Sequence, residues 1–214
     1  MSNTLTRCQL YLISPPEVGG DFPARLERAL SAPVGKSPIT AFQFRVKGVG
    51  QHEAAELARP LQEICAAHDV AFIVNDDVAL AKRLGADGVH LGQQDGSVRD
   101  AREELGRAAQ IGVTCHGSRH LAMEAGEQGA DYVAFGAFYP SSTKDIEHLA
   151  DIEVIEFWSE LFEIPSVAIG GITPENCQPI IDAGVDFIAV SGAVWNGDET
   201  AAVRAFAEKL RTGK

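Results

Sequence analysis

The sequence predicts a single (β/α)8 TIM-barrel domain spanning residues 1–214. Three observations support it: eight short apolar segments, amphipathic helical patterns between them, and a repeated Gly-x-Asp signature. Strict alternation of strands and helices predicts parallel strands joined by right-handed crossovers. Because eight such units leave no room for a second domain, we expect the sheet to close into a barrel.

The predicted strands are short runs of apolar and β-branched residues, as is typical of parallel strands covered on both faces. In chain order they are residues 9–14, 41–45, 71–75, 88–91, 110–114, 132–135, 166–169 and 187–190. The Gly-x-Asp signature recurs at residues 85–87, 129–131 and 184–186. Each glycine is expected to end a helix immediately before a strand begins.

Apolar residues at helical spacing fill several segments between the strands. The stripes comprise Leu57, Leu61, Ile64 and Cys65; Val98, Ala101 and Leu105; Leu149, Ile152, Ile155, Trp158 and Phe162; and finally Val203, Phe206 and Leu210. Pro60 lies inside the first stripe, so that helix is expected to begin late or to kink.

Composition narrows the range of partners. The formal charge of −12 argues against nucleic acid or an anionic membrane, because both require a basic surface. No segment has the length or the apolar core of a membrane span or a secretory signal. The four cysteines form no Cys-x-x-Cys pair, so we expect reduced thiols in a cytoplasmic protein. The oligomeric state stays open, a homo-oligomer included.

Functional residues of such a barrel gather where the strands end. Alternation along the second predicted strand places Gln43, Arg45 and Lys47 on one face, pointing into the barrel mouth. Burial of these groups is costly unless they meet an anionic ligand. The alternative interpretation is a frayed strand with a solvated Lys47.

Acidic residues follow the third and fourth predicted strands. Of Asp76 and Asp77, one can cap the next helix while the other faces the site. Asp95 follows the fourth strand, so its carboxylate and that of Asp76 can share one hard cation. Mg2+ prefers carboxylate, water and phosphate oxygens, which predicts a diphosphate–Mg2+ site. His90 is expected to be a packed, hydrogen-bonded histidine rather than a ligand.

The later loops carry groups that bind anions. Hydroxyls and one cation follow the sixth strand at Ser141, Thr143 and Lys144. A Gly-Gly pair after the seventh strand and a Ser-Gly pair after the eighth allow backbone N–H groups to approach a phosphate. After the fifth strand, His116 has either a proton-transfer or a structural role, and Cys115 has no visible base partner.

Five segments in this order resemble the thiamine-phosphate synthase family, over a stretch from Tyr11 to about Ala193. They are Gln43-x-Arg45-x-Lys47, Asn75-Asp76-Asp77, Val89-His90-Leu91-Gly92-Gln93-Gln94-Asp95, Ser141-Ser142-Thr143-Lys144 and Ala168-Ile169-Gly170-Gly171-Ile172. The resemblance implies a transferase of thiamine biosynthesis. Its small-molecule substrates would be 4-amino-5-hydroxymethyl-2-methylpyrimidine diphosphate and thiazole phosphate, and its products thiamine phosphate and diphosphate.

The resemblance also implies roles for single residues. The Mg2+ ligands would be Asp76 and Asp95. The catalytic residues would be Arg45, Lys47 and Lys144, on the diphosphate, and Thr114, near the reacting groups. The substrate-binding residues would be Gln43, on the pyrimidine, Asn75, on the diphosphate, and Ser141, Thr143, Gly171, Val190 and Ser191, on the thiazole phosphate.

Three positions depart from the family pattern. Val46 replaces an acidic or polar residue, Ser141 a threonine and Thr114 a serine.

Two other functions stay open. A thiazole tautomerase of the same superfamily would use His116 without a metal, and the convergence of acidic and basic residues argues against it. A non-catalytic barrel that binds a phosphate ligand is compatible with the same sequence.

Overall fold

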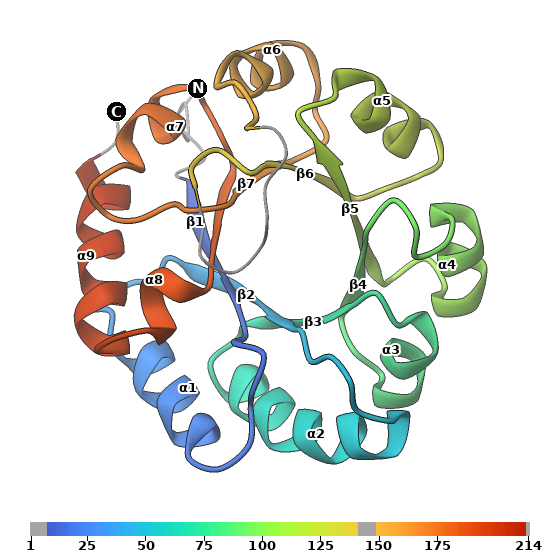
Figure 1. Ribbon diagram of the computed structural model, residues 1–214, viewed down its shortest axis with the longest axis vertical. Coiled ribbons are helices and arrows are strands. Elements are labelled where there is room, and N and C mark those ends of the chain that lie inside the picture. Colours follow the sequence, from blue (N-terminus) through green and yellow to red (C-terminus); the bar gives the residue numbers. More distant parts are fainter. Residues whose placement is uncertain (1–7, 141–148, 213–214) are drawn as a thin grey trace.

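Eight parallel strands form a closed ring in the computed structural model, which describes residues 8–140 and 149–212 (Figure 1). Each strand pairs with the next along the chain, and β8 pairs with β1. The predicted (β/α)8 barrel is therefore confirmed. The strands are Gln9–Ile13 (β1), Ile39–Phe44 (β2), Ala71–Asn75 (β3), Gly88–Leu91 (β4), Gln110–His116 (β5), Tyr132–Gly136 (β6), Ser166–Ile169 (β7) and Phe187–Val190 (β8).

Helices surround the ring of strands (Figure 1). They are Phe22–Ser31 (α1), Gln51–Ala67 (α2), Val78–Leu84 (α3), Val98–Leu105 (α4), Arg119–Glu127 (α5), Glu153–Leu161 (α6), Gln178–Asp182 (α7), Gly192–Trp195 (α8) and Glu199–Thr212 (α9). Helix α2 begins before Pro60 and continues through it, so the expected late start is wrong. Pro60 is exposed, and the carbonyl group that lacks its N–H partner can therefore bond to water. No helix in the described ranges has the length and apolarity needed to cross a membrane.

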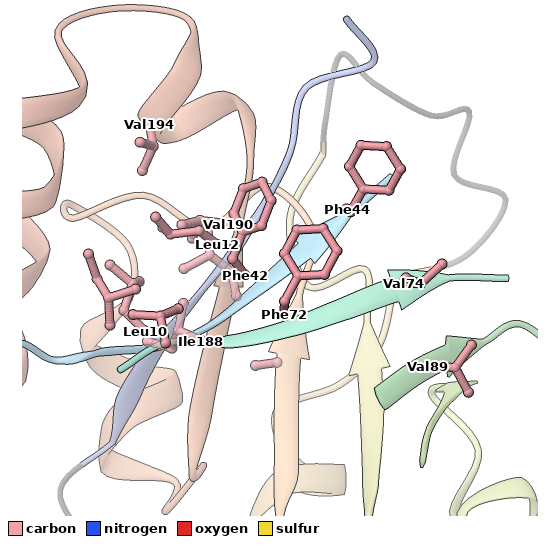
Figure 2. Packing of buried hydrophobic residues seen from close by; sticks show 14 of the residues in the cluster. Leu10, Leu12, Phe42, Phe44, Phe72, Val74, Val89, Ile188, Val190 and Val194 are labelled. Carbon is pink, nitrogen blue, oxygen red and sulfur yellow. The ribbon is translucent and has the colours of Figure 1, made fainter. Parts of the chain in front are cut away.

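Alternation along the strands separates two groups of buried residues. Figure 2 shows side chains of the larger group, which packs between the strands and the helices and includes Phe42, Phe44 and Phe72. The smaller group fills the inside of the barrel and consists of Tyr11, Ile13, Ile73, Tyr132, Ala134, Val167 and Ala189. The opposite orientations predicted for Gln43 and Phe44 follow from this alternation.

Two tyrosine rings occupy much of the barrel interior. Tyr11 and Tyr132 meet edge to face, with ring centroids 6.1 Å apart. A Cβ atom at Gly112 would overlap the Tyr132 ring, so this position of β5 accepts only glycine while the ring stays in place. The two rings close the middle of the barrel. On their side toward the N-terminal strand ends lies a cavity of about 270 Å³, which Tyr11, Tyr132, Ile73 and Val167 help to line.

The Gly-x-Asp signature has a second role that local sequence does not reveal. As predicted, its glycines follow the ends of α3, α5 and α7, and they have φ of +59° at Gly85, +93° at Gly129 and +91° at Gly184. The aspartate that follows accepts a hydrogen bond from a backbone N–H near the start of the preceding strand. The pairs are Asp87 with Phe72 (2.7 Å), Asp131 with Ile111 (2.7 Å) and Asp186 with Ser166 (2.8 Å).

Loss of one of these carboxylates should destabilise the barrel. Asp186 also accepts a hydrogen bond from the hydroxyl of Ser166, which is fully buried. We expect Asp186→Ala to lower the free energy of unfolding by about 1–3 kcal/mol, because both donors of Ser166 lose their acceptor. Urea denaturation measures this change. Asp186→Asn keeps an acceptor oxygen and should retain most of the stability, and Glu103→Ala, on the exposed face of α4, should have little effect. Equal losses for the three variants would contradict the role of Asp186.

Candidate active site

The first group of predicted site residues follows β2. This strand ends at Phe44, so Arg45 and Lys47 lie in the next loop, and their predicted place on one strand face with Gln43 is wrong. The reason is Ser14, which directly follows β1. Its hydroxyl accepts a hydrogen bond from the Arg45 N–H at 2.9 Å and donates to the Arg45 carbonyl at 3.1 Å. A side chain therefore replaces the strand ladder at this point.

The three residues lie at different depths in the barrel mouth. Gln43 is buried inside the barrel, Arg45 is half-buried and Lys47 is exposed. Ser14, which is itself buried, fixes both backbone polar groups of Arg45. The role of Ser14 is not evident from the sequence, where its only signal is a hydroxyl at the end of a mostly apolar strand.

Asp76 and Asp77 divide two tasks between them, as predicted. Asp77 caps α3: its carboxylate accepts a hydrogen bond from the Leu80 N–H at 2.8 Å and another from Gln51 Nε2 at 3.0 Å. Asp76 has a left-handed backbone with φ of +66°, and its N–H donates to the His90 carbonyl at 2.8 Å. Such a conformation is uncommon for a residue other than glycine, and it commonly occurs at functional sites.

Asp95 closes a tight turn after β4. Its Oδ2 accepts a hydrogen bond from the Gly92 N–H at 2.9 Å. A Cβ atom at Gly92 would lie 2.6 Å from the same oxygen, so any other residue there would displace the Asp95 carboxylate. Nearby, Gln93 Nε2 donates to the Thr114 carbonyl at 2.6 Å and joins this turn to the end of β5.

The two acidic side chains come together at the mouth of the barrel. Burial raises the pKa of Asp76, and the adjacent carboxyl group of Asp95 raises it further. Lys47 and Arg45 oppose this rise in the pKa of Asp76, so their charges also lie close by. The structure therefore brings together both predicted metal ligands and both cations. Within residues 8–140 and 149–212, no group of three or more His, Cys, Asp or Glu side chains could hold a metal.

Two carboxylates are a donor set that suits Mg2+. This ion commonly binds one or two carboxylates and completes its coordination with water and substrate phosphate oxygens. The mutual repulsion of Asp76 and Asp95 fits such an ion, because a divalent cation shared between them would offset it.

His90 of β4 and Thr114 of β5 face the barrel interior. His90 Nδ1 lies 3.1 Å from the Tyr132 hydroxyl, and Nε2 lies 2.8 Å from Thr114 Oγ1. Burial lowers the pKa of His90 to about 4, so its ring is neutral near pH 7. The prediction of a packed and hydrogen-bonded histidine is confirmed. Asn75 lies opposite His90 in the β3–β4 register.

A register shift lies between Thr114 and His116 near the end of β5, and His116 pairs with Phe135 beyond it. Cys115 is fully buried, and burial raises the pKa of its thiol to about 12, which agrees with the expectation that it is no nucleophile. His116 is exposed and has φ of +52°.

The opposite side of the mouth is built from the loops after β6, β7 and β8. The Tyr139 N–H donates to the Gly170 carbonyl at 3.0 Å, and a Cβ atom at Gly171 would lie 2.5 Å from the Pro140 carbonyl oxygen. The Gly-Gly pair therefore also permits close packing of two loops. Gly171 accepts a hydrogen bond from Asn176 Nδ2 at 2.9 Å.

The end of β8 is fastened to β1. Val190 is buried, and the Ser191 hydroxyl donates to the Ser14 carbonyl at 3.3 Å. Trp195 Nε1 donates to the Ile13 carbonyl at 2.7 Å. These contacts hold Val190 and Ser191 at the same end of the barrel as the acidic pair. Ser141, Thr143 and Lys144 lie outside the described residues.

A family model described as thiamine monophosphate synthase matches residues 10–194. The chain belongs to the thiamine monophosphate synthase family. A thiamine-phosphate synthase of Erythrobacter litoralis is 70% identical over 212 residues, which cover 98% of this chain and 99% of that protein. One of Rhodospirillum centenum is 49% identical over 195 residues, which cover 90% and 91%. A solved thiamine phosphate pyrophosphorylase from Pyrococcus furiosus aligns with a TM-score of 0.83 at 29% identity and covers 98% of both chains.

For this member of the thiamine monophosphate synthase family, the two adjacent aspartates should respond oppositely to substitution. We expect Asp77→Ala to lower the free energy of unfolding by about 1 kcal/mol, because α3 loses its N-terminal cap. Asp77→Ser retains a capping oxygen and should recover most of the loss. Chemical denaturation of the metal-free protein measures both. A stability unchanged by Asp77→Ala would contradict the cap.

Asp76→Asn should instead stabilise the metal-free protein near pH 7. A carboxyl group whose pKa is raised by folding contributes stability at low pH and loses it as the pH rises through that pKa. Asparagine has no such charge and tolerates the left-handed backbone. The gain in melting temperature should shrink as the pH falls toward 3.8, the ordinary pKa of the carboxyl group. Melting curves of both proteins in EDTA across this pH range measure the gain. A gain in melting temperature that did not depend on pH would contradict the raised pKa of Asp76.

Proposed function

We propose that this chain couples 4-amino-5-hydroxymethyl-2-methylpyrimidine diphosphate to thiazole phosphate in an Mg2+-dependent reaction that yields thiamine phosphate and diphosphate. One observation carries the proposal: the carboxyl groups of Asp76 and Asp95 adjoin each other within reach of the charges of Arg45 and Lys47. Membership of the thiamine monophosphate synthase family supports the reaction. The four described cysteines are free, which fits a reaction in the cytoplasm.

The chemistry requires stabilisation of a departing anion rather than a protein nucleophile. An aminopyrimidine can carry positive charge on its methylene carbon, so the main barrier lies in the negative charge that develops on diphosphate. Arg45 and Lys47 lie near the acidic pair and would bind the diphosphate oxygens. Groups oriented before the reaction stabilise such charge effectively. Mg2+ held by Asp76 and Asp95 would add Lewis-acid stabilisation of the leaving group.

The remaining residues divide between the two substrates. Gln43, buried at the base of the mouth, would bind the pyrimidine, and Asn75 would bind the diphosphate next to the metal. Thr114, which accepts or donates a hydrogen bond at His90, would lie near the reacting groups. Gly171, Val190 and Ser191 would bind the thiazole phosphate, together with Ser141 and Thr143, and Lys144 would bind the diphosphate.

Coupling and metal binding are tested together with purified protein, both substrates and Mg2+. We expect diphosphate release that EDTA abolishes and excess Mg2+ restores. Asp76→Asn or Asp95→Asn should lower kcat/KM by about 100-fold or more, because the leaving group loses electrostatic stabilisation. Glu103→Gln removes an exposed carboxylate from α4 and should leave the rate unchanged.

Melting temperatures provide a measurement that does not depend on turnover. Mg2+ should raise the melting temperature of the wild-type chain and of Glu103→Gln, but not of the Asp76→Asn or Asp95→Asn variants. Full activity in excess EDTA would defeat the metal assignment. Isomerisation of a thiazole phosphate without coupling would favour the tautomerase, and binding without any turnover would favour a non-catalytic barrel.

A further inference from the structure

A chain of hydrogen bonds crosses the barrel interior from β2 to β5. Gln43 Nε2 donates to the Tyr11 hydroxyl at 3.1 Å, and the Tyr11 hydroxyl lies 3.0 Å from that of Tyr132. His90 continues the chain from Tyr132 to Thr114, with contacts of 3.1 and 2.8 Å. Its five members come from five strands, and the chain joins two residues of the proposed active site.

The hydrogen-bonded chain is enclosed by protein. The exposed fractions are 3% for Gln43, 3% for Tyr11, 8% for Tyr132 and 6% for His90. The ring of His90 stacks on that of Tyr132, with an interplanar angle of 23°. Within the described residues, every buried side-chain nitrogen and oxygen atom has a hydrogen-bond partner. A donor left without an acceptor here would be costly, so the hydrogens along the chain must be arranged consistently.

Protonation states restrict that arrangement. Burial raises the pKa of Tyr11 to about 12 and that of Tyr132 well above its ordinary value, so both hydroxyl groups keep their protons. His90 is neutral and carries one N–H. Each of these three residues can therefore donate one hydrogen bond within the network. All the hydrogen bonds of the network must then be donated in the same sense along it.

The amide group of Gln43 sets the direction. Since its Nε2 donates to Tyr11, the hydroxyl of Tyr11 must donate to Tyr132, its other polar contact among the described residues. Tyr132 then donates to Nδ1 of His90. The proton of His90 is thereby placed on Nε2, from which it is donated to Thr114 Oγ1. Thr114 accepts at this contact and keeps its own hydroxyl proton for another partner.

We propose that Tyr11, Tyr132 and His90 are positioning residues that fix the hydrogen-bonding polarity of Gln43 and Thr114, and thereby select an aminopyrimidine over an oxopyrimidine. The inference rests on the function proposed above. With Nε2 of Gln43 held by Tyr11, the amide offers its carbonyl oxygen to a ligand. That oxygen accepts a hydrogen bond from an exocyclic amino group. An oxo group in the same place would instead put two acceptor oxygens, which repel each other, in contact.

The tautomer of His90 is the direct test of the direction. Nitrogen NMR of protein labelled with 15N-histidine distinguishes a protonated from an unprotonated ring nitrogen, and the spectrum of His90→Gln identifies the signals of His90. We expect the proton on Nε2 in the absence of any substrate. A proton on Nδ1 would overturn the proposal. Because no turnover is measured, this result is independent of whether the chain makes thiamine phosphate.

Substrate selection is tested with Tyr11→Phe, which removes the acceptor for Gln43 Nε2 and nothing else from the ring. The measured quantity is the inhibition constant of the 4-oxo analogue of the pyrimidine diphosphate divided by the KM of the amino substrate. We expect this ratio to fall about tenfold in Tyr11→Phe and in Tyr132→Phe, the equivalent of one hydrogen bond. The wild-type ratio should be retained by Ser166→Ala, which loses a buried hydroxyl at the start of β7.

If the two tyrosines had only a structural role, their substitution would weaken the binding of the amino substrate and of the oxo analogue equally. The ratio would then stay unchanged in both variants, even if the overall rate fell. An unchanged ratio in Tyr11→Phe would therefore overturn the selection mechanism. If the wild-type chain released no diphosphate at all, the proposed function would fail, and the NMR result would still decide the direction of the hydrogen bonds.

Discussion

Closure of the parallel sheet is the constraint on which the other features depend. Pairing of β8 with β1 leaves no free strand edge and directs all eight strand ends to the same rim. Residues far apart in the sequence, such as Ser14 and Ser191, therefore meet there. The narrow interior accepts few side chains, so polar groups inside it must bond to one another. The same closure thus produces both the site and the hydrogen bonds beneath it.

The site also illustrates a conflict between stability and binding. Asp76 is partly buried against a second carboxyl group and has a left-handed backbone, three properties that each disfavour the folded chain. Asp77, one residue later, has a favourable helix-capping geometry. The destabilising features are confined to the residue that faces the mouth, while its neighbour anchors the loop. Such a division lets a strained group be held without loss of the surrounding structure.

Sequence alone predicted the features that depend on local periodicity. All eight strands, the opposite orientations of Gln43 and Phe44, and the capping by one of two aspartates follow from neighbouring residues. The end of β2 was misplaced because Ser14, 31 residues away, replaces the strand ladder at Arg45. The contact between Tyr11 and Tyr132 spans 121 residues and had no sequence signal except the glycine opposite Tyr132. Long-range hydrogen bonds of this kind cannot be inferred from one strand at a time.

The three aspartates at the helix-to-strand turns bear on how a nascent chain assembles. Each accepts a hydrogen bond from a backbone N–H only 15 to 20 residues earlier. The contact at the N-terminal ends of two neighbouring strands can therefore form soon after both strands leave the ribosome. The contact of Trp195 with Ile13 spans 182 residues and must wait for nearly the whole polypeptide. The local contacts cost little loop-closure entropy, whereas joining the first strand to the last closes a loop of nearly the whole chain.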